Sequence, residues 1–141
     1  MRSIHLLNRQ RKTKLPLDRL NQFAQRALAA LQPLAKIRTS FDEIVVVLVS
    51  DKQIAAIHRK FMNIRGPTDV VTFQHGEIVV SAETAARQAP LFGKTTEQEL
   101  ELYLVHGLLH LCGYDDGTRP GYEEMARLQE QIAIACRAGR V

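Results

Sequence analysis

The segment Glu43–Val49 (EIVVVLV) is an almost unbroken run of β-branched and aliphatic side chains. A run of this length and composition favours a β-strand, because branched side chains pack well on a pleated surface. No polar residue alternates with the apolar ones inside the run, so we expect both faces of the strand to be covered. Such a strand requires further layers of secondary structure packed against its sheet.

Amphipathic helices are predicted on both sides of this strand. Residues 17–31 place apolar side chains at helical spacing, and Pro33 ends that helix. Ser50 and Gln53 match a capping box and predict a second helix that runs to about residue 61. Its inward face would carry Ile54, Ile57 and Phe61.

Strands and helices continue to alternate along the rest of the chain. Further strands are expected at Ser3–Leu7, Asp69–Phe73 and Glu77–Val80, and further helices at 82–88, 97–112 and 121–138. Thr96 and Glu99 match a capping box that would open the helix over 97–112. The order of elements predicts one α/β or α+β layer sandwich, with residues 1–141 as a single domain.

Charge is distributed unevenly along the chain. Residues 1–65 carry 13 basic and 4 acidic side chains, whereas residues 66–141 carry 6 and 11. A basic half of this kind can attract a polyanion such as nucleic acid, although a solvated basic surface explains it equally well. Aromatic residues are few, with no Trp, three Tyr and five Phe, so no stacking platform for single strands is evident.

The segment of residues 106–116 contains the candidate metal ligands. His106 and His110 are four residues apart, so a helix places both imidazoles on one face, where they can bind one metal ion. Gly113 is suited to end that helix, and Asp116 follows closely enough for its carboxylate to return to the same ion. Two histidines, one carboxylate and an open fourth position form a known catalytic zinc set.

Other interpretations of these residues stay open at this point. Two histidines at helical spacing also arise by chance, and two histidines with a carboxylate also bind Fe(II) in non-haem oxygenases. Gly107 replaces the glutamate of the HExxH metallopeptidases. Glycine inside a helix costs about 1 kcal/mol relative to alanine, which indicates that another group approaches the helix closely there.

The segment HGLLHLCGYDD, residues 106–116, resembles the HGxLHLxGYDH signature of the YbeY-type rRNA-maturation endoribonucleases. Residues 67–73 (PTDVVTF) and 76–81 (GEIVVS) are similar to that family's PTDVLSF and GDIVIS segments. The resemblance spans residues 43–138, and the N-terminal strand and helix fit it loosely. It implies a mixed β-sheet with flanking helices and a metal site on a helix and the loop after it.

The resemblance also implies a function. It implies a zinc-dependent, single-strand-specific endoribonuclease that acts in 3′-end maturation of small-subunit (16S) rRNA and in ribosome quality control. One zinc ion would be held by His106, His110 and Asp116. The implied partners are rRNA and the small ribosomal subunit, with ribosomal proteins or ribosome-associated GTPases as further candidates.

Two positions depart from the family pattern. The third histidine of the signature is Asp116 here, so the Zn²⁺ site would carry a net charge near +1 instead of +2, and we expect a weaker Lewis acid. The arginine that precedes the PTDV segment in the family aligns with Met62. Arg59 and Arg65 are the candidate substitutes for contacts to RNA, and the sequence identifies no general base.

The missing arginine keeps a second functional class open, a ribosome-associated RNA-binding factor with a structural zinc and no cleavage of its own. A membrane protein is not expected, because no apolar run approaches the roughly 18 residues that a membrane span needs. Two cysteines cannot form a disulfide scaffold, and no secretory leader is recognisable, so the expected location is the cytoplasm.

Overall fold

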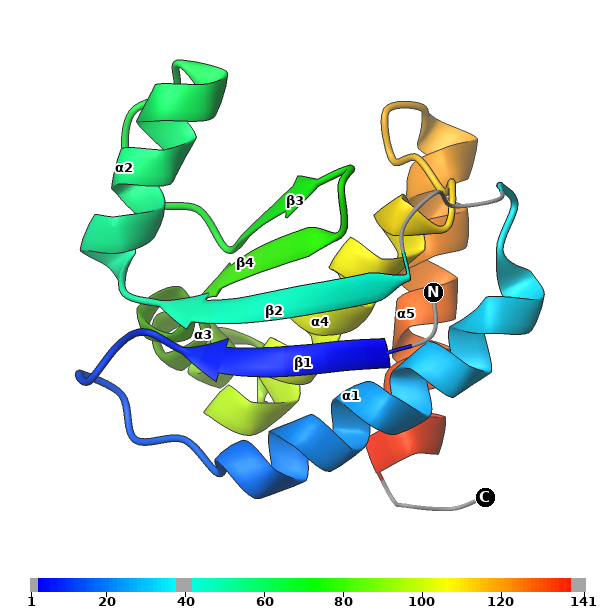
Figure 1. Cartoon of the computed structure of the whole chain (residues 1–141), viewed down its shortest axis with the longest axis horizontal. Coiled ribbons are helices and arrows are strands. Elements are labelled where there is room, and N and C mark those ends of the chain that lie inside the picture. Colours follow the sequence, from blue (N-terminus) through cyan, green and yellow to red (C-terminus); the bar gives the residue numbers. More distant parts are fainter. Residues whose placement is uncertain (1–2, 38–41, 138–141) are drawn as a thin grey trace.

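In the part of the chain that the structure describes, a four-stranded mixed sheet forms the centre of the molecule (Figure 1). The computed structural model describes residues 3–37 and 42–137. The strands lie in the order β1-β2-β4-β3, where β1, β2 and β4 run parallel and β3 is an edge strand antiparallel to β4. Their bounds are β1 Ser3–Asn8, β2 Glu43–Val49, β3 Val70–Phe73 and β4 Glu77–Ser81.

Within residues 3–37 and 42–137, five α-helices flank this sheet, which confirms the expected α/β class. They are α1 Leu17–Leu31, α2 Asp51–Met62, α3 Ala82–Gln88, α4 Thr96–Leu111 and α5 Arg119–Arg137. Two short 3₁₀ turns follow α1 and α3, over Gln32–Leu34 and Ala89–Phe92. The predicted end of the last helix at Ala138 lies outside the described residues.

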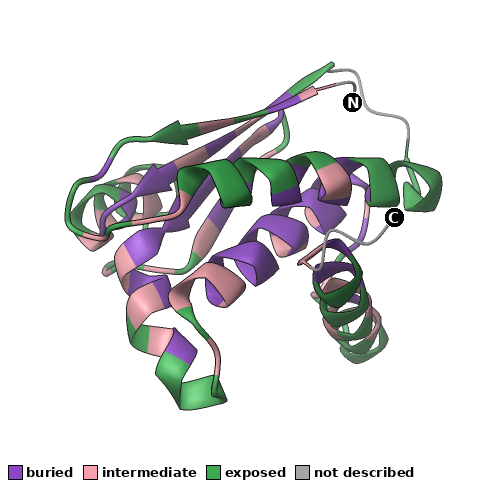
Figure 2. Ribbon diagram, turned by 90° about the horizontal axis from the view of Figure 1, so that it is seen from below, coloured by how far each residue is buried: buried purple, intermediate pink, exposed green. Residues whose placement is uncertain are grey.

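The main core lies between one face of the sheet and the helices α1, α4 and α5. Ile44, Val46 and Leu48 of β2 are at most 2% exposed and pack in this core. The buried residues of the covering helices lie on the sides that face inward, and their outer sides are exposed (Figure 2). No helix in the described part of the chain has the length and apolar character that crossing a membrane requires.

The opposite face of the sheet is covered only in part. Ile54 of α2 packs there against Val49, Val71 and Val79. Val47 of β2 is only half-buried on this side, so the expected covering of β2 on both faces is confirmed only in part. Figure 1 shows the reason, because α2 stands at the end of the sheet and extends beyond it.

The distal end of α2 therefore departs from its predicted packing. Its first turn has the predicted capping box, in which Ser50 Oγ accepts from the Gln53 N–H. Phe61, expected to face inward, is 59% exposed, because α2 extends beyond the sheet at this end and the Phe61 ring meets only the edge strand, at Phe73 of β3. The helix ends at Asn63, which adopts a left-handed φ of 55°.

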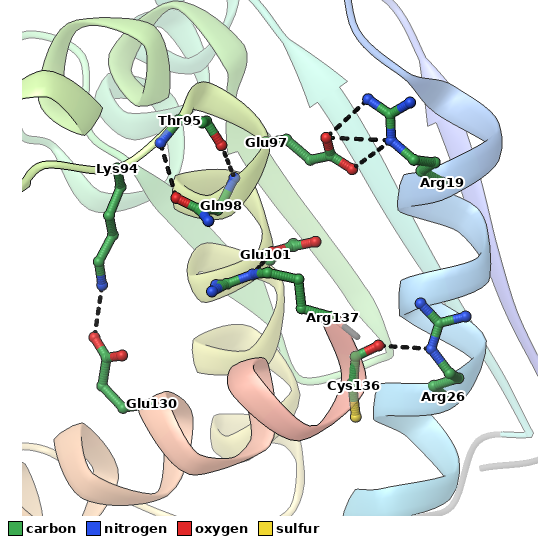
Figure 3. Close-up of polar contacts among 10 residues, drawn as sticks. All are labelled: Arg19, Arg26, Lys94, Thr95, Glu97, Gln98, Glu101, Glu130, Cys136 and Arg137. Carbon is green, nitrogen blue, oxygen red and sulfur yellow. Dashed lines mark hydrogen bonds and ion pairs between the residues drawn. The ribbon is translucent and has the colours of Figure 1, made fainter. Parts of the chain in front are cut away.

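Helix α4 lies at the centre of the core and carries the predicted histidines. It begins one residue before the predicted start, because Thr95 rather than Thr96 is the N-cap and its hydroxyl accepts from the Gln98 N–H. Ion pairs from its first turns tie it to α1 and α5, namely Arg19 to Glu97 and Arg137 to Glu101 (Figure 3).

Gly107 of α4 permits a close contact with the sheet. The sequence indicates such a close approach but not the group that makes it. A Cβ atom at this position would lie 2.6 Å from Cγ2 of Ile78, which is fully buried on β4. The close approach at Gly107 is therefore made by a core side chain and not by a ligand. It brings α4, with His106 and His110, tightly against the sheet.

Candidate metal centre

The two histidines of α4 converge as their spacing predicts. His106 Nε2 and His110 Nε2 lie 3.1 Å apart, and the ring centroids are separated by 4.7 Å. Their side chains are 25% and 23% exposed, whereas the neighbouring Leu108 and Leu109 are fully buried. The apolar sides of α4 thus fix the helix in the core and leave both imidazoles at the protein surface.

The loop after α4 brings a carboxylate to the same point. Gly113 adopts a left-handed φ of 97°, which reverses the chain as glycine at a helix end commonly does. Tyr114 then anchors the loop by donating its hydroxyl to the Leu34 carbonyl at 2.8 Å. Asp116 Oδ2 lies 3.6 Å from His106 Nε2 and 3.7 Å from His110 Nε2.

These three atoms have the separations that a tetrahedral ion requires. With metal bonds of roughly 2.0–2.1 Å, two ligand atoms of a tetrahedral zinc ion lie about 3.3–3.4 Å apart. The observed separations of 3.1, 3.6 and 3.7 Å lie on both sides of that value. His106, His110 and Asp116 form the group of described residues able to hold a metal ion, and the donor set fits zinc.

Helix α5 supplies a contact that sequence reasoning missed. Gln129 Oε1 lies 3.0 Å from His106 Nδ1, and an oxygen there favours the tautomer in which the Nδ1–H donates a hydrogen bond to it. This hydrogen bond places the other nitrogen, Nε2, towards the candidate ion with its lone pair free. A glutamine 23 residues from His106 on another helix gives no sequence signal, because the contact depends on how α5 packs on α4.

A hollow of about 210 Å³ opens beside the candidate centre along the edge strand β3. Its lining includes His106, His110, Thr72 and Met62. Met62, the position where the resemblance implies an arginine, thus lies at the site but brings no cation there. Arg59 and Arg65 are exposed on and after the last turns of α2, and neither is among the described residues that line the hollow.

A second hollow, of about 430 Å³, lies on the other side of His106. Asp69, Glu99 and Glu130 give its rim an acidic character, and the charge of Lys94 is paired with Glu130 at 2.7 Å. Burial, followed by the neighbouring Glu99, raises the pKa of Tyr103 far above its ordinary value. Tyr103 therefore remains a neutral hydroxyl group in this hollow.

Other reactive side chains of the motif have structural roles. Asp115 Oδ1 accepts from the Gly117 N–H at 3.0 Å, which shapes the loop before α5. Cys112 is fully buried, and burial raises the pKa of its thiol, so it remains an unreactive core residue. Of the isolated histidines, His5 pairs with Glu43, and His58 Nδ1 lies 3.0 Å from the Gly66 carbonyl oxygen.

Comparison with known proteins gives matches to one family. A family model described as Endoribonuclease YbeY matches residues 5–136. The Endoribonuclease YbeY of Thermobifida fusca is 33% identical over 139 residues, covering 85% of this chain and 85% of the relative. That of Acholeplasma laidlawii is 40% identical over 95 residues, covering 62% and 69%. The solution structure of TM1509 from Thermotoga maritima has a TM-score of 0.65 and 25% identity, covering 96% of this chain and 93% of that one.

The family match extends beyond the predicted range into β1 and α1, which the motifs fitted loosely. It confirms the expected enzyme class, a nuclease that acts on RNA. The chain belongs to the endoribonuclease YbeY family.

Proposed function

We propose that this chain is a zinc-dependent endoribonuclease whose single ion is held by His106, His110 and Asp116. Its substrate is single-stranded RNA at the 3′ end of small-subunit (16S) rRNA, and its roles are the maturation of that end and ribosome quality control. The small ribosomal subunit is the proposed partner, with ribosomal proteins and ribosome-associated GTPases as further candidates, and the cytoplasm is the proposed location. Arg59 and Arg65 are the proposed contacts to the RNA backbone.

One observation carries the proposal: two imidazole nitrogens and one carboxylate oxygen converge within 3.7 Å of one another at the surface. Structural zinc sites are closed by four protein ligands, whereas catalytic sites keep a position open. The side chains of the three residues here are 23–36% exposed and a hollow opens beside them. The open side favours a catalytic ion over the alternative, an RNA-binding factor with a structural zinc.

The residues of the chain have separable tasks in this reaction. Bound zinc supplies Lewis-acid stabilisation of the charge that develops on a phosphoryl group. Gln129 holds the His106 ring in one tautomer, and the Asp116 carboxylate reduces the net charge of the site. Basic side chains on α2 hold the polyanionic substrate by charge and with little base specificity.

A nuclease assay separates the catalytic from the binding function. Native protein should cleave single-stranded rRNA segments, and His110→Ala should lose the cleavage while it still binds RNA. Equal cleavage by native protein and His110→Ala would indicate a contaminating nuclease and would support the binding-factor alternative. Gln131→Ala changes an exposed residue of α5 away from the histidines. It controls for the effect of preparing and purifying a variant protein.

Metal analysis addresses the third possibility, the Fe(II) set of the oxygenases. Protein purified without added metal should contain one zinc per chain, and His110→Ala should contain much less. One iron per chain in the native protein, with cleavage restored by iron and not by zinc, would contradict the proposal.

A further inference from the structure

Three rings from different elements form a row at the surface beside the candidate centre. Phe61 of α2 and Phe73 of β3 meet edge to face with centroids 5.2 Å apart. Phe73 and His75 are stacked, with centroids 5.6 Å apart and an angle of 23° between the rings. Phe61 is 59% exposed and the His75 side chain 71% exposed, so both ends of the row are accessible. Phe61, Phe73 and His75 are called the aromatic row below.

Sequence patterns do not predict this row, because helical periodicity places Phe61 towards the core. Its packing on Phe73 is partial, since α2 extends beyond the sheet at this end. Met62 and Ile64, which follow in the chain, are also 45% and 50% exposed. Contiguous exposed apolar and aromatic side chains on a protein surface are a feature of interaction sites.

Charge identifies what this surface can bind. Lys60 Nζ lies 5.3 Å from the centroid of the Phe61 ring, and Arg59 and Arg65 are exposed nearby in the chain. Aromatic rings interleaved with cations are the arrangement by which proteins bind single-stranded nucleic acid, because bases stack on the rings while phosphates meet the cations. The exposed rings at the second hollow, Phe92 and Tyr122, lie instead beside an acidic rim.

The row is also continuous with the candidate metal centre. Met62 and Gln74, each adjacent in the chain to members of the row, line the hollow that contains His106 and His110. The same hollow is lined by Val71 and Thr72, whose side chains point to opposite faces of β3, so it follows the edge of that strand. A strand of RNA can therefore pass from the candidate ion over the β3 edge to the aromatic row.

We propose that the aromatic row is a base-stacking subsite that positions unpaired RNA nucleotides next to the cleavage site. This inference rests on the proposed function, since it takes RNA as the substrate of the same centre. It also supplies a physical reason for a preference for single strands, because the bases of a duplex are stacked on one another and cannot reach the rings.

Binding of a short single-stranded RNA that carries 2-aminopurine tests the proposal without cleavage, in buffer with a chelator and no added metal. Phe61→Leu keeps an apolar side chain but removes the ring, and it should weaken binding about 5- to 150-fold, as loss of one stacked base does. Phe61→Tyr keeps the ring and should bind as the native protein does. His75→Gln should also weaken binding, and His75→Tyr should preserve it.

Two matched controls separate stacking from charge and from general apolar contact. Phe92→Leu makes the same change at a phenylalanine that is 65% exposed outside the row, and RNA affinity should not change. Lys60→Gln should reduce the salt dependence of binding by about one unit of slope, whereas Phe61→Leu should leave the slope unchanged. An abasic site opposite the row should abolish the difference between native protein and Phe61→Leu.

The outcomes distinguish this inference from the function it rests on. Unchanged affinity in Phe61→Leu and His75→Gln, with normal cleavage of RNA by the native chain, would overturn the subsite and leave the nuclease function standing. An equal loss in Phe92→Leu would also overturn it, because the strand would then lie on the other side of His106. A native chain that binds no single-stranded RNA would overturn both proposals.

Discussion

Alanine at position 107 should destabilise the chain, although alanine normally favours a helix. The new Cβ atom would lie 2.6, 3.0 and 3.1 Å from three side-chain carbons of Ile78. Gly107 and Ile78 are both buried between α4 and β4, so neither can move into solvent. Overpacking of a core costs about 1–3 kcal/mol, and the helix propensity of alanine returns about 1 kcal/mol. The expected net loss is about 1 kcal/mol and at most about 2 kcal/mol.

Urea unfolding followed by circular dichroism measures this change. The matched background is Ile78→Ala, which removes all three carbons that the new methyl group would meet. In that background Gly107→Ala should become stabilising by about 1 kcal/mol, because only the helix propensity remains. If Gly107→Ala alone raised the free energy of unfolding by about 1 kcal/mol, α4 could not lie as close to β4 as described, and the positions of both histidines would be in doubt.

Three further predictions concern the centre and its supporting contacts. Gln129→Ala should lower zinc affinity about 10- to 100-fold in a competition titration, whereas Gln129→Glu should keep the native affinity. Native affinity in the alanine variant would show that the contact of Gln129 with His106 does not support zinc binding. Asp116→His should shift the pH profile of RNA cleavage to lower pH, because the site gains one unit of positive charge, and an unchanged profile would refute that reasoning. Burial raises the pKa of Glu101 in the folded protein despite its pairing with Arg137. The contribution of Glu101 to the free energy of unfolding is therefore fully present below its ordinary pKa of about 4.5 and is lost as the pH rises through the raised pKa of the folded protein. Urea unfolding between pH 4 and 7 should show the native protein losing stability relative to Glu101→Gln, and a relative gain would contradict this.

Local patterns determine the elements of this fold well. The bounds of α1 and β2 agree with the sequence prediction, because hydrophobic periodicity, Pro33 and a β-branched run act within the segment itself. The predicted start of α4 differs from the observed start by one residue, because Thr95 and Thr96 are each followed three positions later by a Gln or Glu. Both pairs match a capping box, and only the backbone geometry selects Thr95.

Tertiary placement accounts for what the sequence could not predict. Helical periodicity groups Phe61 with Ile54, but it does not show that α2 extends past the sheet, where Phe61 meets only Phe73 of the edge strand and stays exposed. Gln129 and the aromatic row depend on how separate elements meet, so neither the spacing of residues nor the count of aromatics indicates them. The grouping of His106 with His110 was predictable because a single helical turn determines it.

A crystal structure of zinc-loaded protein, with anomalous scattering collected on both sides of the zinc edge, tests the central claim most directly. The account predicts one strong anomalous peak roughly 2.0–2.1 Å from Nε2 of His106, Nε2 of His110 and a carboxylate oxygen of Asp116. A peak bound by other residues, or no peak at these three side chains at saturating zinc, would contradict it.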